Sequence, residues 1–211
     1  MPPDPVTADD LLAAADLTVA VLDAGRDGDW SARAGQLDWT CWETVEHLAD
    51  DWFDYAAQLS GDAARVPFEA ESRSADGPPN TIRAEVSEGV DGLIAVCRSM
   101  AFVHAAVVRA VPSTARDHHI YGTADPEASA AMGVVEALAH THDVAIGLGV
   151  PFEGDAGLAA KVLHRLMPDV ERTDDAWADF LWACDRLDTP ERPRRGPWRW
   201  FNDPSEAPGA P

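Results

Sequence analysis

Residues 125–149 read DPEASAAMGVVEALAHTHDVAIGLG, and this stretch predicts one long helix. Asp125 can accept hydrogen bonds from the free N–H groups of the first turn, and Pro126 suits the first helical position. Gly147 and Gly149 suit the far end, where glycine commonly ends a helix. We interpret the rest of the chain as the scaffold that completes a site on this helix.

Two side chains on this helix form a candidate metal-binding pair. Glu136 and His140 are four residues apart, so they project from the same side of the helix, and Asp143 shares that side. A carboxylate and an imidazole at this spacing can bind one divalent ion, but a third ligand must come from elsewhere in the chain. The alternative is a solvated Glu–His pair on a polar helix face.

The composition excludes several classes of partner. The chain has 211 residues, 37 acidic against 16 basic, and a formal net charge of -21. Nucleic acid and anionic membrane would both be repelled, so we expect neither as a partner. We find no apolar run long enough for a membrane span and no secretory signal. The three cysteines form no metal or disulfide pattern, which favours a reducing, cytoplasmic location.

The remaining periodic segments predict an all-α protein. We expect a four-helix bundle with one long crossover at Gly61–Pro79, because no segment alternates as a strand does. Residues 1–211 are expected to form a single domain, in which 7–150 make the bundle and 151–211 a helical extension with a Pro- and Trp-rich tail. The expected helices, besides that at 125–149, are 7–24, 41–60 with a capping box from Thr40 to Glu43, Asn80 or Thr81 to 111, and the short helices 155–167 and 174–187.

Three further features have both a chemical and a plain interpretation. His47 shares a helix side with Glu43, Asp51 and Asp54, although a lone histidine there is more often a surface residue. Cys41 would sit in the first turn of its helix, where the dipole can lower a thiol pKa, but inert packing is commoner. His118 and His119 are expected to be exposed loop residues unless they face a site. The block Trp198–Phe201 can line a pocket or pin the tail to the helices.

The segments WTCWETVEHL at 39–48 and EALAHTHD at 136–143 together resemble motifs of a known family. The first is similar to W-T-V-x-D-L-x-x-H-L and the second to E-x-x-x-H-x-x-D of the DinB-like superfamily, in particular of the mycothiol-dependent maleylpyruvate isomerase N-terminal domain. That resemblance covers about residues 7–150. It implies a helical bundle that holds one divalent metal through His47, Glu136 and His140.

What the resemblance implies for chemistry is a thiol-using metal enzyme. Zinc is the expected metal, with nickel or iron as alternatives, and mycothiol or another small thiol is the expected cosubstrate. The family's isomerases use an arginine near the start of the third helix, for which Arg83 is the nearest candidate. Arg83 or Arg116 is expected to hold a substrate carboxylate by paired hydrogen bonds. Those isomerases carry a sizeable second domain, whereas about 60 residues follow the bundle here.

The expected function is therefore a metal-dependent thiol transferase or isomerase that acts on an electrophilic small molecule, with a homodimer as a possible assembly. Two alternatives stay open. One is a non-catalytic helical module that binds metal or a small ligand, and the other is a metal-dependent hydrolase. A metal with an open coordination position beside an accessible pocket would favour an enzyme over the module.

Overall fold

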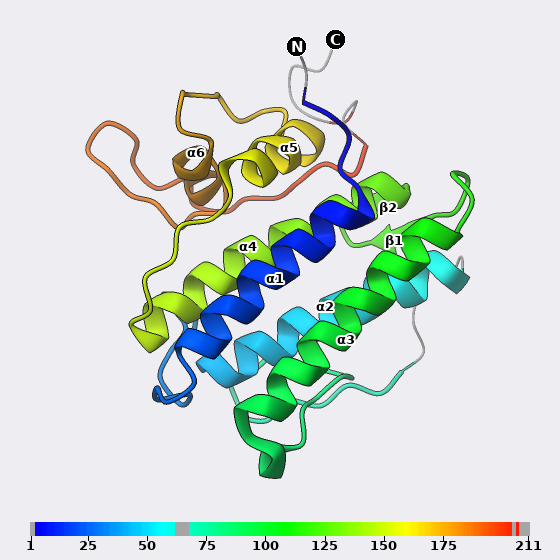
Figure 1. The fold of residues 1–211 in the computed structure, drawn as a ribbon. Helices are drawn as coiled ribbons and strands as arrows, with labels where there is room; N and C mark the ends of the chain where they lie inside the picture. Colours follow the sequence, from blue (N-terminus) through cyan, green and yellow to red (C-terminus); the bar gives the residue numbers. More distant parts are fainter. Residues whose placement is uncertain (1–2, 62–67, 204–205, 207–211) are drawn as a thin grey trace.

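The computed structural model describes residues 3–61, 68–203 and 206, and this part of the chain is mostly helical (Figure 1). An all-α class was expected, and the dominance of helix agrees with it. Part of the expected crossover, residues 62–67, lies outside the described residues, as do residues 1–2 and most of 204–211. The elements are α1 (Ala8–Ala24), α2 (Cys41–Gly61), the 3-10 turn η1 (Val86–Glu88), α3 (Gly89–Ala110), β1 (Asp117–His119), β2 (Gly122–Ala124), α4 (Pro126–Leu148), α5 (Ala156–Leu166) and α6 (Ala176–Ala183).

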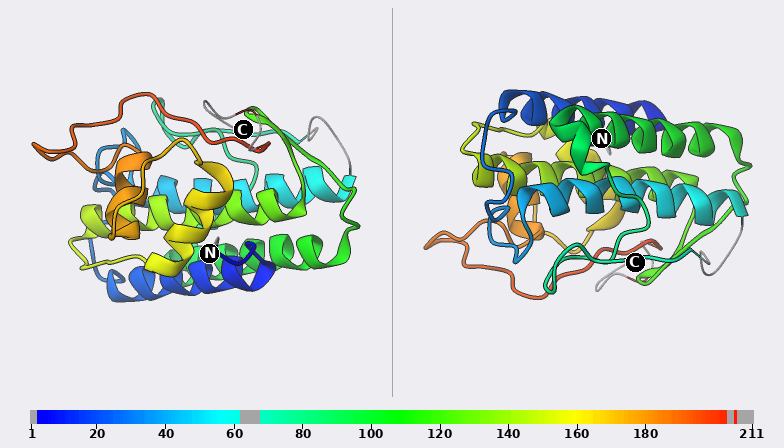
Figure 2. Two further views of the ribbon diagram at one scale, coloured as in Figure 1. Left: turned by 90° about the horizontal axis from the view of Figure 1, so that it is seen from above. Right: turned by 90° about the horizontal axis from the view of Figure 1, so that it is seen from below.

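The four long helices run alongside one another (Figure 2). Both α1 and α2 pack against α3 and α4. Helix α4 is almost entirely enclosed, since from Ala128 to Ala145 only Glu136 and His142 are not fully buried. Small residues make this possible: a Cβ at Gly133 would lie 2.8 Å from Leu11 Cδ1 and 2.9 Å from His104 Cε1. Close contact between α4 and both α1 and α3 therefore requires glycine at this position.

The predicted ends of two helices are confirmed by their hydrogen bonds. Thr40 Oγ1 accepts from the backbone N–H of Glu43, and Glu43 Oε2 accepts from that of Thr40, so the capping box forms before α2. Asp125 accepts from the N–H of Ala128 at the start of α4, and Gly149 ends α4 with a φ of 67°. These local signals act within one helical turn, which is why the sequence predicts them.

The start of α3 differs from the prediction. A helix was expected from Asn80 or Thr81, but α3 begins at Gly89. Asn80 instead pairs with Glu71 in an isolated antiparallel bridge. The N–H of Thr81 donates to Asp50 Oδ1 at 2.9 Å, so α2 holds the groups that would have started the helix. The prediction failed because a partner far along the chain competes for these backbone groups.

His118 and His119 were expected in a loop, but β1 and β2 form a short antiparallel hairpin there, before α4. Asp117, the first residue of this hairpin, is buried and accepts a hydrogen bond from Ser129 Oγ of α4 at 3.0 Å. His104 Nε2 of α3 lies 3.0 Å from the same hydroxyl group. This buried chain of polar groups ties the hairpin to α3 and α4.

The C-terminal part covers one side of the long helices. Helix α5 packs on α4, and α6 packs on α5 (Figure 1). Helix α6 is shorter than the predicted 174–187, because the chain leaves the helix at Cys184 and Asp185 takes a φ of 60°. The segment after it runs along the side of α2 and α4 that faces away from α1 and α3 (Figure 2). Tail residues can therefore reach groups on α2 and α4.

Within the described residues, one helix meets the length and composition expected of a membrane span. It covers Val86–Ala110, and about a third of its most apolar window is buried among the other helices. Phe102 and Val103 on its outer side are exposed. Apolar helices of soluble proteins meet the same condition, so the expectation of no membrane partner stays a prediction.

Candidate metal centre

Two histidines and an aspartate converge where α2 faces α4. His47 and Asp51 lie one turn apart on α2, and His140 lies on α4. One ligand atom from each of the three lies within 4.8 Å of the other two. The His47 Nε2 to Asp51 Oδ2 distance is 3.4 Å. Imidazole nitrogens and a carboxylate oxygen are the donors that zinc and related divalent ions take in proteins.

Glu136 extends this cluster without being one of the three. Its Oε2 lies 3.2 Å from His140 Nε2, so the predicted side-by-side placement of these two residues is confirmed. The Tyr55 hydroxyl group donates to Glu136 Oε1 at 3.2 Å. The side chains of Glu136 and His140 are only 14% and 8% exposed, so the alternative of a solvated surface pair is wrong. The metal role of Glu136 stays a prediction.

Asp143 and Arg186 hold His140 from the other side. Asp143 Oδ2 lies 3.4 Å from His140 Nδ1. Arg186 Nε and Nη2 donate to the two oxygens of Asp143 at 3.2 and 2.6 Å. A carboxylate behind the far nitrogen of a histidine fixes the ring and its tautomer, as the partners of metal-binding histidines do. The arrangement leaves His140 Nε2 on the side of Glu136 and the cluster.

Burial and charge set the protonation of these groups in the absence of a metal. Burial and the neighbouring His140 lower the pKa of His47 to about 4, so its ring is neutral and can act as a ligand. Burial raises the pKa of Asp51 well above its usual range, and the charge of Glu136 adds to this. Burial alone would lower the pKa of His140, but Asp143 and Glu136 outweigh it and raise that pKa.

The residues present fit a divalent ion, because Asp51 brings to the cluster a buried carboxylate oxygen that accepts no hydrogen bond. Asp51 Oδ2 lies 3.4 Å from His47 Nε2, whereas His140 Nδ1 faces Asp143 and leaves Nε2 toward the cluster. A buried carboxylate oxygen with no donor is costly, and the other carboxylates near it make its negative charge costlier. A cation between His47, Asp51 and His140 would remove that cost for Asp51.

The cluster lines a cavity of about 430 Å³, within the range of small-molecule sites. Its wall is largely aromatic, and apart from α2 and α4 these aromatic residues come from three parts of the chain. Trp39 precedes α2, His119 and Tyr121 lie in or beside the β1–β2 hairpin, and Trp198 and Trp200 belong to the C-terminal tail. The other lining residues are Ile120, Ala139, Tyr55 and Arg186, together with His47, Asp51, Glu136 and His140.

The structure does not bring the two predicted substrate arginines to this cavity. Arg83 Nη2 donates to Glu71 Oε2 at 2.8 Å, on the segment before η1. Arg116 Nη1 donates to the carbonyl groups of Ser113 and Ala115, in the turn before β1. Neither lines the cavity, whereas Arg186 does. Arg83 was chosen as the arginine nearest the start of a helix, and that helix begins six residues later, at Gly89.

Sequence reasoning missed three of the residues around the cluster. Asp51 could have been found, because it stands four residues after His47, the same spacing as Glu136 and His140. His119 was expected to be exposed unless it faced a site; it stacks on Trp200 with ring centroids 5.0 Å apart and lines the cavity, so the alternative holds. Arg186 carries no local signal, since only the path of the tail places it there.

The cysteines take no part in this site. Cys41, Cys97 and Cys184 are buried and free. Burial raises the pKa of Cys41 to about 11 and that of Cys97 to about 12. Their thiols therefore stay protonated near neutral pH, which agrees with inert packing and removes Cys41 as a nucleophile.

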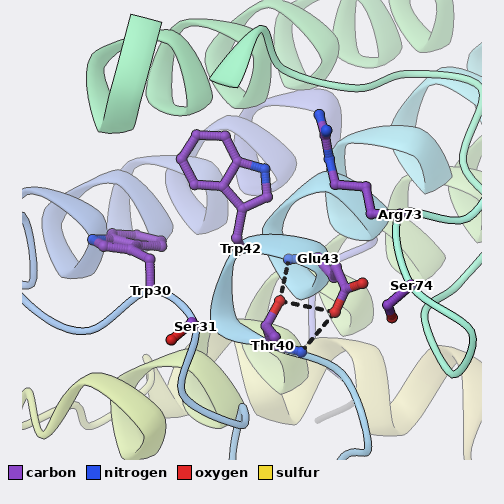
Figure 3. A pocket seen from close by; sticks show the side chains of 7 residues that line it. All are labelled: Trp30, Ser31, Thr40, Trp42, Glu43, Arg73 and Ser74. Carbon is purple, nitrogen blue, oxygen red and sulfur yellow. Dashed lines mark hydrogen bonds between the residues drawn. The ribbon is translucent and has the colours of Figure 1, made fainter. Parts of the chain in front are cut away.

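A second hollow of about 320 Å³ lies near the start of α2 (Figure 3). Trp30 and Trp42 form its aromatic side with an edge-to-face contact. Its charged groups have partners within the protein: Glu43 closes the capping box with Thr40, and Arg73 forms an ion pair with the buried carboxylate of Glu46. Trp42 Nε1 is buried without a hydrogen bond. The charged side chains of this hollow are therefore already paired within the protein and are not free to bind a charged ligand.

The chain matches no protein-family model, no curated protein and no solved structure. Its function is therefore inferred from the chemistry and geometry of the site.

Proposed function

We propose that this chain is a metal-dependent enzyme that activates a small thiol for attack on an electrophilic small molecule. The observation that carries the proposal is the His47–Asp51–His140 cluster, with ligand atoms within 4.8 Å of one another, at the wall of a cavity large enough for a small molecule. Zinc is the proposed metal, with nickel or iron as alternatives, and mycothiol or another small thiol is the proposed cosubstrate.

We further propose that the fold is a four-helix bundle of the DinB-like type. Support comes from the pairing of α1 and α2 with both α3 and α4. It also comes from the long connection between α2 and α3, which is the crossover expected of this bundle. The metal cluster then lies between α2 and α4, as the resemblance of the two motif segments implies.

The protein groups have separable roles in this proposal. His47, Asp51 and His140 hold the ion and leave a coordination position open toward the cavity, as catalytic rather than structural zinc sites do. Asp143 and Arg186 fix the ring of His140. The aromatic wall excludes water from the ligand. When bound, a divalent ion would lower the pKa of a thiol and so supply a nucleophile near neutral pH.

A second candidate function, a metal-dependent hydrolase, is favoured by Glu136. This carboxylate lies beside the cluster, 3.2 Å from His140, and accepts a hydrogen bond from Tyr55. A carboxylate next to a catalytic metal can take a proton from a water molecule, which is the role of a general base in hydrolases. In the thiol enzyme, the same carboxylate would take the proton of the thiol. A module without catalysis would need neither role.

The test begins with metal content. Elemental analysis of the purified protein should give about one divalent ion per chain, and alanine at His47, Asp51 or His140 should reduce the content sharply, because two remaining ligands hold zinc poorly. Full metal in all three variants would place the metal elsewhere. Alanine at Glu136 separates the two ligand sets, since its loss should reduce metal only if it coordinates.

Thiol chemistry is tested on the metal-loaded protein. Mycothiol and simpler thiols are titrated by calorimetry in buffers of different ionisation enthalpy, because a thiol that binds the metal releases its proton. Heat with proton release is the expected result. If no thiol produces either, the thiol enzyme is rejected. Metal-dependent cleavage of ester or amide substrates would then support the hydrolase, and its absence would leave the binding module.

A further inference from the structure

Aromatic side chains form much of the wall of the cavity beside the metal cluster. His119 stacks on Trp200 with centroids 5.0 Å apart and an angle of 29° between the rings. Tyr121 contacts Trp200 edge to face at 5.2 Å, and Trp198 adds a third contact at 5.9 Å. Trp39 lies beside the metal cluster, with its ring centroid 4.7 Å from that of His47. A planar ring that enters would therefore meet several faces and edges, the contacts that aromatic pairs prefer.

The tail holds this wall in place. The backbone N–H of Phe201 donates to the carbonyl group of Leu166 at 2.7 Å. Asn202 Nδ2 donates to the carbonyl group of Gly122 at 2.7 Å, and Arg165 donates to that of Asn202. Trp200 is only 3% exposed. Because the tail is hydrogen-bonded to both α5 and the hairpin, we infer that its two tryptophans are held in fixed positions beside the cavity.

The charges of the cavity leave no cation for a second anionic group. Among the described lining residues, Arg186 alone carries a guanidinium or ammonium group. Arg186 already donates twice to Asp143 and once to the carbonyl group of Cys184. Asp51 and Glu136 add two carboxylates, which one divalent ion would neutralise. Aromatic faces carry negative partial charge and repel anions further.

Arg199 contacts Tyr121 of the cavity wall but is not itself a lining residue. Arg199 lies over the rings of Tyr121 and Phe201, and it donates to the carbonyl groups of Tyr121 and Trp200. A carboxylate buried in the cavity would therefore have no cationic partner. Trp200 Nε1 is buried without a hydrogen bond and can donate one neutral hydrogen bond to such a group, but a buried charge without an opposite charge stays disfavoured.

We propose that this cavity takes a planar aromatic or conjugated ligand that has one metal-binding donor group and no second negative charge. The inference rests on the metal centre of the proposed function, but not on its thiol chemistry. It sets this chain apart from enzymes that bind dicarboxylates, in which arginine commonly binds a carboxylate by paired hydrogen bonds. The metal and the single donor fix one end of the ligand, and the tail tryptophans receive its ring.

The test uses hydroxamates, because they share one metal-binding group and differ only in the body attached to it. Acetohydroxamate, cyclohexanecarbohydroxamate, benzohydroxamate and 4-carboxybenzohydroxamate are titrated by calorimetry into the zinc-loaded full chain. Benzohydroxamate should bind about 10-fold more tightly than the cyclohexane compound of similar size, a difference of about 1.4 kcal/mol. The 4-carboxy compound should bind at least about 10-fold more weakly than benzohydroxamate, because its carboxylate finds no cation.

Each outcome has a separate meaning. Equal affinities for the aromatic and cyclohexane compounds, or a tighter 4-carboxy compound, would overturn the inference and leave the metal enzyme standing. Aromatic selectivity without any thiol response would reject the thiol chemistry and keep the inference. If no hydroxamate binds a protein shown to contain zinc, the open metal position is absent and both proposals fail.

Two variants locate the selectivity. Trp200→Leu should remove most of the preference for benzohydroxamate over the cyclohexane compound. Trp30→Leu, in the second hollow, is the matched control and should leave the ratio unchanged. Circular dichroism and zinc content show whether each variant is folded and loaded. If Trp200→Leu does not fold, the ratios measured on the unaltered chain still decide the inference.

Discussion

Asp51→Asn should change metal binding and metal-free stability in opposite directions. The substitution keeps the shape of the side chain but removes its charge. In the metal-free protein, Asp51 Oδ2 is buried without a hydrogen bond, and burial together with Glu136, Asp50 and Asp54 raises the pKa of this carboxyl group. Asparagine should therefore stabilise the metal-free protein at pH 8, where an ionised Asp51 is costly. The same change removes one of three candidate ligands.

The structure sets the size of both effects. The side chain of Asp51 is 18% exposed, so solvent screens it little. An unsatisfied buried polar group costs about 1–3 kcal/mol, and we expect a gain in unfolding free energy in that range. Loss of even an outer partner of a metal ligand weakens binding about 10- to 100-fold, so the loss of Asp51 should weaken zinc binding by at least that factor.

The assay compares urea unfolding of chelator-treated protein at pH 8 with zinc affinity measured by competition against a chromogenic chelator. Asp54→Asn is the matched control, because Asp54 lies on the same helix and burial also raises its pKa, but it is not one of the three clustered residues. The control should leave zinc affinity within about 2-fold. If Asp51→Asn destabilises the metal-free protein, or keeps full zinc affinity, the reasoning about this cluster is refuted.

Four further predictions follow from other parts of the structure. Burial raises the pKa of Asp117 to about 7, so the stability that this group contributes is present below about pH 4 and lost as pH rises through 7. Asp117→Asn should therefore gain stability relative to the unaltered chain between pH 5 and pH 8, by up to about 1.4 kcal/mol per pH unit. If urea unfolding gives the same difference in unfolding free energy between the two proteins at every pH, this prediction is wrong. Tyr55→Phe removes the donor to Glu136 and should leave zinc affinity within about 2-fold with circular dichroism unchanged, because His47, Asp51 and His140 hold the ion; a loss of about 10-fold would place Glu136 among the ligands. Arg73→Met leaves the fully buried carboxylate of Glu46 without its cation, with the backbone N–H of Ala84 still donating to it, and should cost about 3–5 kcal/mol in urea unfolding; adding Glu46→Gln should recover most of the loss. Chelation of the metal should lower the melting temperature but keep a cooperative transition, because the four long helices bury an apolar core without it; a non-cooperative melt would disprove that independence.

Local signals in the sequence determined most of the helices. The capping box of Thr40 and Glu43 and the two ends marked by Asp125 and Gly149 each act within one helical turn. The same holds for the placement of Glu136 beside His140, because residues four apart always share one side of a helix. These features depend only on residues that are close together in the chain, so they can be predicted from the order of the residues.

Tertiary structure alone decided where α3 begins, because Asp50 of α2 binds the backbone of Thr81 and so prevents an earlier start. It also decided which residues surround the candidate site. His47 and His140 lie together because α2 faces α4, a pairing that the resemblance of the two motif segments implied but no local signal predicts. Trp200 reaches the cavity because hydrogen bonds from the tail to α5 and the hairpin hold it there. Contacts between distant segments depend on which faces are buried together, and that is a property of the whole packed chain.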